Sequence, residues 1–515
     1  MSGVRWPYGG RCRVCVSLAE PTHDRLLERF DELRRGGLRG ADLAEVRLDA
    51  LNDGIELSKA AFGRLIATSP VPLGFTLRPT WQGGAYDGGE QRRREILARA
   101  AAAGPGFIDV ELTAEWATEV VGASPAPVVL SHHWYEPGVP PDLDELVARA
   151  TASGAAMIKL VASAASPDDA VPLLAAGAGL ALAGQPTSCF CMGEAGRSSR
   201  LLAAARGAAL IYAAAESGAE VAPGQWTVRE LVDVLGVTRW RPGLRLFGLV
   251  GDPIGHSLSP AIFNAVLRRR RRNAAYVPLH GGDLDAVLRL AKVAGVHGVS
   301  VTMPFKESMA ARSSVRDRLV EAVGAANTVV FGKRWSAHNT DAQAVVDALA
   351  AVRPLAGTRV ALLGAGGAAR GAAAGLVAAG CRVTLLNRTV ERARRVAERL
   401  GLDYGAPQVL DRRAFDIVIN ATPVGMTGTP HVRESPVAEG CLHGEEIVLD
   451  MVYRPRRTVL LRQAAAAGCV VIDGLEMFVR QAAAQYRLLT GDRGDPPLAL
   501  MRATAEHVLG QDKSK

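Results

Sequence analysis

Residues 358–369 read Thr-Arg-Val-Ala-Leu-Leu-Gly-Ala-Gly-Gly-Ala-Ala, and this stretch decides the fold of the second half of the 515-residue chain. The apolar run predicts a strand, and the alanines after the glycines predict the start of a helix. The turn between them matches G-x-G-x-x-A, in which glycines let the backbone approach a pyrophosphate at the helix N-terminus. A tight packing turn remains the alternative for the glycines alone.

The strand expected next, residues 382–386, ends in Asn387-Arg-Thr389 and is followed by Arg392. A protein that binds NAD has Asp or Glu at this place, whereas an arginine suits the 2′-phosphate of NADP. We therefore expect NADP as the cofactor, with its nicotinamide near the ends of the later strands. The expected cofactor-binding residues are Gly364, Ala365, Gly366, Gly367, Ala368, Asn387, Arg388, Thr389, Arg392, Asn420, Thr422, Met426, Gly474 and Met477.

The segment that precedes this unit carries polar motifs among its short expected strands. Ser257 and Ser259 are paired hydroxyls that suit a carboxylate, and Lys306 with Asp341 makes a plausible proton-transfer pair. Each residue also has a plain structural reading, such as a helix cap for Asp341. The motifs are Gly255-His-Ser-Leu-Ser-Pro260, Ser300-Val-Thr-Met-Pro-Phe-Lys306, Asn327-Thr328 and Asn339-Thr-Asp341.

The first half of the chain repeats a different pattern, in which a short apolar strand is followed by a loop and an Ala/Leu/Arg-rich helix. Eight such units favour an α/β fold of the closed (β/α)8 barrel type, with an open doubly wound sheet as the alternative, since periodicity does not separate the two. The pattern resets near Trp240-Arg-Pro-Gly243, so we place a domain boundary at residue 243. The expected strands are 12–18, 43–48, 73–77, 107–112, 128–132, 156–161, 188–192 and 208–213.

Polar residues stand at the C-terminal ends of these strands, where barrels place their active sites. Lys159 is one of two lysines in this half, and a poorly hydrated lysine near other cations is a nucleophile toward a ketone. His133 could remove the proton that an imine acidifies, and Glu111 could orient its ring. Any single residue could be a structural pair, but the whole set indicates a site. Its members are Glu45, Arg47, Arg78, Glu111, His133, Lys159, Arg200 and Gln225.

Composition excludes several protein classes. With 48% apolar and 22% charged residues the chain is neither a disordered chain nor a fibre. The net charge of +8 is uneven, because residues 1–243 are net acidic and residues 244–515 net basic. This asymmetry favours two fused modules, and the basic one should bind an anionic ligand. No stretch approaches the roughly 20 apolar residues of a membrane span.

The cysteines and basic residues predict no metal and no nucleic acid. Seven scattered cysteines do not form a disulfide framework, and Cys12 and Cys15 are expected to be buried apolar side chains rather than zinc ligands. The five arginines 268–272 are expected to be a solvated helix end. We see no secretory signal and expect a cytoplasmic protein, or a plastid one if a transit peptide has been removed.

Several motifs of the first half resemble type I 3-dehydroquinate dehydratase over about residues 11–235. That family is a metal-free barrel that converts 3-dehydroquinate to 3-dehydroshikimate through a lysine imine. The resemblance implies Lys159 as the imine lysine, His133 as general acid/base and Glu111 as its support. The motifs are Glu45-Val-Arg-Leu-Asp49, Thr76-Leu-Arg-Pro79, Asp109-Val-Glu-Leu112, Ser131-His-His133, Met157-Ile-Lys159, Met192-Gly193, Ser199-Arg200 and Ala222-Pro-Gly-Gln225.

The same resemblance implies that the remaining rim residues, Glu45, Arg47, Arg78, Arg200 and Gln225, line the substrate site. The chain departs from the family at two places. Val221 stands where the family has a hydroxyl residue, and Gln82 stands where the family commonly has glutamate.

The second half resembles shikimate dehydrogenase over about residues 245–510. The resemblance implies a substrate domain, 244–345, that residues 474–515 rejoin, and an NADP domain, 346–473. Lys306 and Asp341 then serve the proton that accompanies hydride transfer, and Tyr453 lies near the nicotinamide. The implied substrate-binding residues are Ser257, Ser259, Thr302, Asn327 and Gln481.

Joined in this order, the halves resemble the plant-type fused enzyme of the shikimate pathway and would catalyse consecutive reactions. Two alternatives stay open from the sequence. An enzyme of quinate breakdown would use the same folds, with NAD or NADP, to oxidise quinate or shikimate. A non-catalytic regulator would be expected to lose Lys159 or the pair of Lys306 and Asp341, and all three residues are present.

Overall fold

The structure, a computed structural model, describes residues 4–52, 58–255, 257–411 and 415–511. The chain separates into two compact units. Residues 1–246 together with 271–296 form the first unit, and residues 247–270 together with 297–515 form the second.

The first sheet of the structure is a parallel barrel. Its strands run in the order β7-β6-β5-β4-β3-β2-β1-β8, with the short β9 (Trp226–Thr227) beside β8. The backbone N–H of Ala209 donates to the carbonyl of Thr187 at 2.7 Å and so joins the β8 side to β7. The closed barrel is therefore confirmed over the open sheet. The strands are β1 (Arg13–Leu18), β2 (Leu43–Arg47), β3 (Leu73–Thr76), β4 (Phe107–Glu111), β5 (Val128–Pro137), β6 (Met157–Ser163), β7 (Thr187–Met192) and β8 (Leu210–Ala214).

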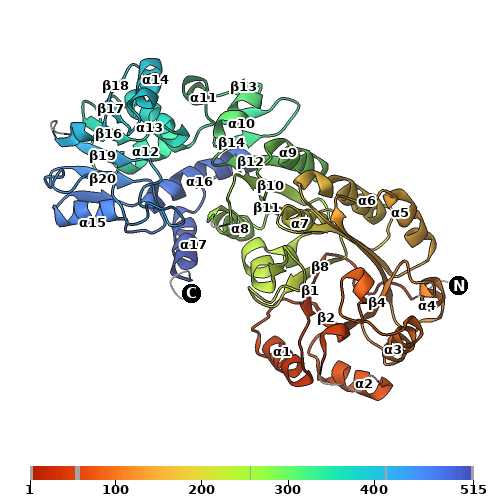
Figure 1. Ribbon diagram of the computed structural model, residues 1–515. Coiled ribbons are helices and arrows are strands. Elements are labelled where there is room, and N and C mark those ends of the chain that lie inside the picture. Colours follow the sequence, from red (N-terminus) through yellow and green to blue (C-terminus); the bar gives the residue numbers. More distant parts are fainter. Residues whose placement is uncertain (1–3, 53–57, 256, 412–414, 512–515) are drawn as a thin grey trace. The chain divides into compact units, whose positions relative to one another are not determined.

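Helices follow each of the first seven strands and surround them (Figure 1). In α1 the hydroxyl of Thr22 accepts from the N–H of Arg25, and the helix ends at Gly36, whose φ of 83° suits glycine. Leu26 and Phe30, four residues apart, bury the inner face of this helix. The helices are α1 (His23–Arg35), α2 (Lys59–Thr68), α3 (Glu90–Ala102), α4 (Ala117–Ala123), α5 (Leu143–Ala152), α6 (Ala170–Leu182) and α7 (Arg197–Ala205).

Short helical turns complete the barrel segment, and a π-helical turn takes the place of an eighth helix. These turns are η1 (Leu48–Ala50), η2 (Thr80–Gln82), η3 (Pro167–Asp169), the π-helical η4 (Glu230–Leu235) and η5 (Val237–Arg239).

The second sheet is mixed and runs in the order β11-β10-β12-β14-β15-β13. Strand β14 pairs antiparallel with both β12 and β15. The strands are β10 (Arg245–Val250), β11 (Ala274–Leu279), β12 (Val296–Val301), β13 (Val315–Arg316), β14 (Thr328–Val330) and β15 (Ser336–His338). The helices of this part are α8 (Ser259–Arg269), α9 (Leu284–Val293), α10 (Lys306–Arg312) and α11 (Arg318–Val323).

The third sheet is parallel throughout and runs in the order β18-β17-β16-β19-β20-β21. The order reverses between β16 and β19, which creates a crevice at the carboxyl ends of these two strands. The strands are β16 (Arg359–Leu363), β17 (Arg382–Leu386), β18 (Asp403–Gly405), β19 (Ile417–Asn420), β20 (Ile447–Asp450) and β21 (Val470–Ile472). The helices are α12 (Asp341–Ala350), α13 (Gly367–Ala378), α14 (Val390–Leu400), η6 (Pro407–Asp411), α15 (Val459–Ala466), α16 (Gly474–Thr490) and α17 (Leu498–Gln511).

Helices bury both faces of this sheet. Val360 and Leu362 of β16 belong to a core that α12 and α13 complete, whereas Ala361 and Leu363 pack with α15 on the other face. Alternate residues of a strand point to opposite faces, so an apolar run is what a strand covered on both sides requires. The Rossmann-like fold expected for the NADP domain is confirmed.

One segment groups differently from the expected division of the chain. We expected all of residues 244–345 to form one domain, but residues 271–296 belong to the first compact unit. There α9 contacts α6 and η3, and Arg289 Nε lies 2.7 Å from Asp168 Oδ1. Within the second unit, α17 contacts α8 and α16 contacts β14. The expected boundaries at residues 243, 345 and 473 remain predictions.

Asp450, the last residue of β20, is a fully buried carboxylate whose partners are neutral donors. It accepts from the hydroxyl of Thr458, the amide of Asn420 and the N–H of Val452, at 2.6, 2.9 and 3.0 Å. Burial raises the pKa of Asp450 to about 6. Folding therefore favours the protonated acid, and this contribution to stability is lost as pH rises from about 4 to 6.

Asp450→Asn removes that ionisation. We expect its free energy of unfolding, relative to the native chain, to rise by up to about 3 kcal/mol between pH 4 and pH 7. Urea unfolding of the full chain at both pH values measures this difference. Asp347→Asn, on the exposed face of α12, is the control and should show no such trend. An equal effect of Asp450→Asn at both pH values would contradict the assignment.

Candidate active sites

The first candidate site lies inside the barrel, on residues from most of its strands. Glu45 lies in β2, Glu111 ends β4, His133 lies in β5 and Lys159 lies in β6. The other predicted members occupy the segments around the strands. Arg47 ends β2, Arg78 follows β3, Arg200 lies in α7 and Gln225 precedes β9. Of the eight, six are at least 95% buried: Glu45, Arg78, Glu111, Lys159, Arg200 and Gln225.

The ammonium group of Lys159 faces two carboxylates and an aromatic ring. Its Nζ lies 3.2 Å from Asp109 Oδ2, 3.6 Å from Glu45 Oε1 and 4.1 Å from the ring centroid of Tyr212. We expected cations beside this lysine, and the groups in direct contact with it are instead anionic. Carboxylates and the face of an aromatic ring both attract positive charge, so the surroundings of this nitrogen favour a cationic group.

Both oxygens of the Glu111 carboxylate contact arginines, and its expected role as support of His133 stays a prediction. One oxygen accepts from Arg78 Nη1 at 2.7 Å and the other accepts from Arg93 Nη1. Arg93 reaches inward from α3 and is fully buried, so two guanidinium groups hold the carboxylate. Glu111 thus fixes Arg78, whose second nitrogen donates to Asp109 at 2.9 Å.

Asp109 and Arg93 contact the predicted residues but were not among them. Asp109 stands two residues before Glu111 on β4, so both carboxylates point to the same side of the strand. Because side chains alternate along a strand, the position of Asp109 two residues before Glu111 could have placed it in the site from the sequence. Arg93 lies within a run of three arginines, 92–94, and nothing local in the sequence distinguishes it from its less buried neighbours.

The side chain of Gln82 is hydrogen-bonded to the backbone of His133. Its oxygen accepts from the backbone N–H of His133 at 2.7 Å, and its nitrogen donates to the carbonyl of His133 at 3.3 Å. The imidazole stacks on Tyr135 with centroids 6.4 Å apart, and its Nδ1 has no hydrogen-bond partner among the described residues. Gln82 thus fixes the backbone of His133 and leaves the ring nitrogens free.

Burial and the charges of Arg78, Lys159 and Arg47 hold the pKa of His133 well below its usual range. A histidine in this setting is neutral at pH 7. Its ring can therefore accept a proton from a molecule bound in the barrel.

Arg200 differs from the other two predicted arginines of the barrel. Arg47 pairs with Asp49 at 2.7 Å and Arg78 pairs with Asp109 and Glu111. Arg200 is 2% exposed, donates to the carbonyl of Pro223 at 3.1 Å, and has no carboxylate partner among the described residues. Burial without an acid lowers the pKa of Arg200. A buried, unneutralised guanidinium is a site for an anion.

Gln225 connects to the same polar set from the opposite side. Its amide nitrogen lies 3.5 Å from the hydroxyl of Ser17, which in turn donates to Glu45 Oε2 at 3.0 Å. The Gln225 oxygen accepts from the N–H of Val221 at 2.8 Å, so the position that lacks the family's hydroxyl still shapes this loop through its backbone.

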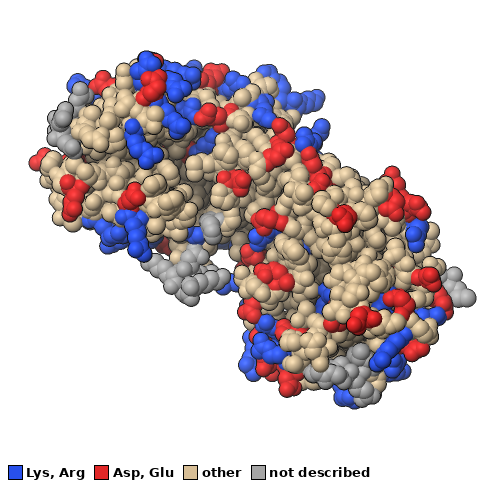
Figure 2. Space-filling model, in the orientation of Figure 1, with Lys and Arg blue, Asp and Glu red and all other residues tan. Residues whose placement is uncertain are grey.

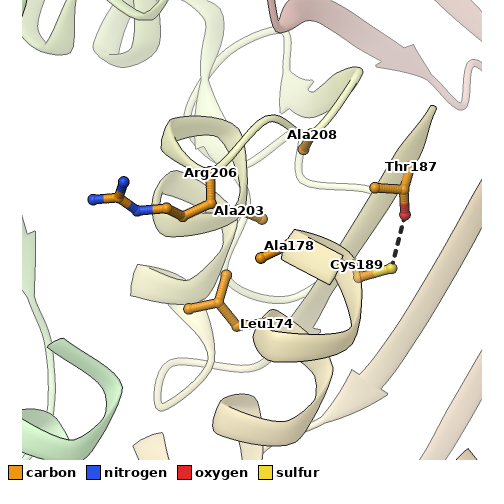
Figure 3. A pocket seen from close by; sticks show the side chains of 8 residues that line it. Leu174, Ala178, Thr187, Cys189, Ala203, Arg206 and Ala208 are labelled. Atoms are coloured by element: carbon orange, nitrogen blue, oxygen red, sulfur yellow. Dashed lines mark hydrogen bonds between the residues drawn. The ribbon is translucent and has the colours of Figure 1, made fainter. Parts of the chain in front are cut away.

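A small cavity elsewhere in the barrel unit is unrelated to this site. It lies between α6, β7 and α7, where Thr187 and Cys189 contact each other (Figure 3). Its volume of about 10 Å³ holds no more than one water molecule. The lining is otherwise mostly apolar, and it contains none of the predicted residues.

The second candidate site centres on Lys306 and Asp341, which the structure brings into contact. Lys306 Nζ lies 2.5 Å from Asp341 Oδ2, and the amide of Asn327 donates to Asp341 Oδ1 at 2.9 Å. Asp341 is the first residue of α12 and 5% exposed. Since both of its oxygens bind side chains from other elements, the reading of Asp341 as a helix cap is wrong.

The remaining substrate candidates surround this pair or lie at the end of the neighbouring strands. The backbone N–H of Thr302 donates to the carbonyl of Val250, which sets the ends of β12 and β10 side by side. Ser257 accepts from the N–H of Ser259 at 3.2 Å in the loop that follows β10. Gln481 is buried in α16, and its carbonyl accepts from Thr340.

Two residues near this pair were missed. Gln485 donates to the carbonyl of Asn327 at 2.8 Å and accepts from Ser300 at 2.9 Å. It lies one helical turn after Gln481, so both side chains lie on one face of α16. This spacing could have placed Gln485 near the site from the sequence. Asn339 accepts from the N–H of Asp341 at 3.1 Å and so fixes the start of α12.

The glycine turn after β16 has the geometry of a phosphate cradle. Gly364 has φ of 115°, and a Cβ there would lie 2.9 Å from the carbonyl oxygen of Ala421. Gly366 has open space around it, and Gly367 begins α13. A Cβ on Gly367 would stand 3.5 Å from Lys306, so this turn lies beside the second site. The residues fit a dinucleotide pyrophosphate.

The end of β17 carries free cations. Arg388 and Arg392 are exposed, and neither guanidinium forms an ion pair within the described ranges. Figure 2 shows Lys and Arg side chains gathered over α14, which begins just after Thr389. Asn387 donates to the carbonyl of Thr389 at 2.9 Å and fixes the turn. These arginines fit the 2′-phosphate of NADP.

The ends of β19 and β20 are held as one network. Asn420 donates to Asp450 and to the carbonyl of Val424, and its oxygen accepts from Thr422. This ties down the turn that leads to Met426. Tyr453 packs on Phe478 with ring centroids 4.7 Å apart. Gly474 begins α16 at a close backbone approach, because a Cβ there would lie 2.6 Å from the carbonyl of Val452, and Met477 is buried one turn later.

The described ranges contain no cluster of three His, Cys, Asp or Glu residues arranged to hold a metal ion. None of the helices in the same part of the chain combines the length and the apolarity that crossing a membrane requires.

Four family models match the chain in succession. They are type I 3-dehydroquinase (residues 14–239), the shikimate dehydrogenase substrate binding domain (249–329), shikimate/quinate 5-dehydrogenase (347–451) and the shikimate 5′-dehydrogenase C-terminal domain (474–506).

Among known proteins, the chain is 35% identical to the chloroplastic bifunctional 3-dehydroquinate dehydratase/shikimate dehydrogenase of Arabidopsis thaliana, over 88% of this chain and 78% of that one. It is 38% identical to the NADP⁺ shikimate dehydrogenase of Methanothermobacter thermautotrophicus, over 52% of this chain and 97% of the relative. The Thermus thermophilus shikimate 5-dehydrogenase solved with NADP(H) and shikimate is 34% identical, with a TM-score of 0.47, over 51% of this chain and 99% of that chain. The chain belongs to the family of bifunctional 3-dehydroquinate dehydratase/shikimate dehydrogenases.

Proposed function

We propose that this chain catalyses two consecutive steps of the shikimate pathway. The barrel dehydrates 3-dehydroquinate to 3-dehydroshikimate through an imine on Lys159, and the second half reduces 3-dehydroshikimate to shikimate with NADPH. The observation that carries the first assignment is a buried lysine beside a neutral histidine in a barrel that also buries an unpaired arginine. The contact of Lys306 with Asp341 beside the glycine turn carries the second.

In the barrel, the substrate carboxylate binds Arg200, the guanidinium that lacks an acid of its own. Lys159, once deprotonated, attacks the ketone carbon, and the carbonyl oxygen leaves as water after it has taken up two protons. The protonated imine acidifies the neighbouring C–H, and His133 accepts that proton. The resulting enamine expels hydroxide, to which His133 returns the proton. Hydrolysis of the imine then releases 3-dehydroshikimate and the free amine.

Glu111 and Asp109 both act on Arg78. They hold its guanidinium at the barrel rim through two ion pairs of 2.7 and 2.9 Å. A guanidinium fixed by two buried acids cannot swing away, so Arg78 presents a fixed positive edge to the substrate hydroxyls.

In the second half, NADPH supplies a hydride when bound at the glycine turn and the arginines after β17. Lys306 then donates a proton to the oxygen of the ketone as it becomes a hydroxyl, and Asp341 holds the ammonium in place. Asn327 keeps the carboxylate aligned through its 2.9 Å hydrogen bond. Ser257 and Ser259 bind the substrate carboxylate.

Small molecules are the partners that we propose for this chain, without nucleic acid, membrane or metal. In the arginine run 268–272, Arg270 pairs with Asp492 and donates to the carbonyl of Asp495, which supports a helix end held within the protein. Each of the seven cysteines is a thiol rather than half of a disulfide, which supports a reducing compartment. We propose the cytoplasm, or the plastid stroma in view of the chloroplastic Arabidopsis relative.

Borohydride reduction in the presence of 3-dehydroquinate tests the imine. We expect covalent substrate on the native chain at Lys159 and none on Lys159→Ala, because only a lysine amine forms the reducible bond. Peptide mass spectrometry locates the adduct. Lys59→Ala replaces the other lysine of this half, exposed on α2, and should label normally. Normal dehydratase activity in Lys159→Ala would refute the imine.

Lys306→Ala tests the second site. We expect its shikimate dehydrogenase kcat to fall about 10²- to 10⁴-fold, the usual contribution of a positioned proton donor, while dehydratase activity stays unchanged. Assays of both activities on one preparation give the result. Lys333→Ala, at an exposed position, is the control. Equal loss of both activities would contradict separate sites.

Arg200→Met tests the carboxylate site of the barrel. Loss of a charge-assisted bond to the substrate should lower dehydratase kcat/KM about 10- to 100-fold, chiefly through KM. Steady-state kinetics measure the effect, and Arg94→Met, on the outside of α3, is the matched control. An unchanged KM in Arg200→Met would assign the carboxylate to another residue.

A further inference from the structure

Tyr212 is a buried aromatic residue to which the reaction scheme gives no role. It is the third residue of β8, is 3% exposed and pairs in register with Cys15 of β1. Its hydroxyl is buried and has no hydrogen-bond partner among the described residues. A tyrosine in a core usually satisfies its hydroxyl, so polar contacts do not explain this side chain.

The face of the Tyr212 ring, by contrast, has a definite partner. Lys159 Nζ lies over it, 4.1 Å from the centroid. Asp109 and Glu45 approach the same nitrogen at 3.2 and 3.6 Å. Three groups that attract positive charge therefore surround the nitrogen of a side chain that is buried in the barrel.

These three groups differ in what they can do with a proton. A carboxylate attracts a cation and can also remove its proton. An aromatic face attracts a cation through its quadrupole and offers no basic site. Tyr212 thus favours positive charge at the nitrogen without competing for the proton that carries that charge.

We propose that the ring face of Tyr212 stabilises the protonated imine on Lys159 and so contributes to dehydration. This proposal rests on the proposed dehydratase function. The nitrogen is positively charged in the imine before the C–H proton leaves and neutral in the enamine afterwards. It becomes positive again once hydroxide has left. Because the imine must be protonated to act as an electron sink, a group that favours the charged nitrogen raises the population from which His133 removes the proton.

Two substitutions distinguish the contribution of the Tyr212 ring from that of its hydroxyl. Tyr212→Phe keeps the aromatic face and should leave dehydratase kcat within about twofold, because the hydroxyl is unpartnered. Tyr212→Leu removes the face and should lower kcat about 10- to 30-fold, the range for a cation–aromatic contact shielded from water. The steady-state yield of borohydride-trapped adduct should also fall in Tyr212→Leu. The reductase activity of the second half should not change in either variant.

A graded series guards against a Tyr212→Leu variant that fails to fold. Phenylalanine, 4-fluorophenylalanine and 3,4,5-trifluorophenylalanine at position 212 have nearly the same shape, and fluorine withdraws electron density from the ring face. We expect log kcat to decline steadily along the series, by about tenfold overall. The basic limb of the pH profile should also move to lower pH, which a merely structural role would not cause.

Two results would overturn the proposal. One is a flat fluorine series in chains that still form the adduct. The other is a Tyr212→Phe variant as impaired as Tyr212→Leu, which would assign the effect to the hydroxyl. Absence of adduct in the native chain is a different failure, since it would remove the imine and with it the proposed dehydratase.

Discussion

A chain of alternating buried charges crosses the interior of the barrel, and the geometry of the dehydratase site depends on it. Each member lies in contact with the next, and the sequence of charges is Glu45, Lys159, Asp109, Arg78, Glu111 and Arg93. A buried charge that loses its partner costs several kcal/mol, so every link constrains its neighbours. The ends of strands β2, β4 and β6 are thereby fixed relative to one another, and with them Lys159, the proposed imine lysine.

Because these buried charges neutralise one another, a buried polar group that has no such partner indicates where a ligand binds. Among the described residues, Arg200 is buried without an acid, and the ring of His133 is held through its backbone and its stacking on Tyr135 rather than through a nitrogen. Arg200 thus supplies a positive site for an anion, and His133 supplies an available base. The second half follows the same logic, since Lys306 and Asp341 satisfy each other next to a glycine turn that leaves room for a phosphate.

Much of this arrangement could be predicted from sequence, because strand ends are local signals. The eight apolar runs, the glycine turn and the polar residues after them gave the barrel, the cofactor domain and positions such as Lys159. Partners that come from distant elements could not be predicted in the same way. Glu111 binds Arg93 from α3, and the nitrogen of Lys159 faces Tyr212 from β8. A tyrosine within an apolar strand looks like ordinary core, and only the fold shows what its ring faces.

Covalent linkage gives the two sites a fixed stoichiometry and a raised effective concentration for a product that diffuses from one to the other.

The most direct measurement of the two-step account is product analysis by NMR after the native chain is incubated with 3-dehydroquinate. Without NADPH, 3-dehydroshikimate should accumulate, and with NADPH it should be replaced by shikimate in equal amount. Unchanged 3-dehydroquinate, or 3-dehydroshikimate that persists when NADPH is present, would contradict the two-step account.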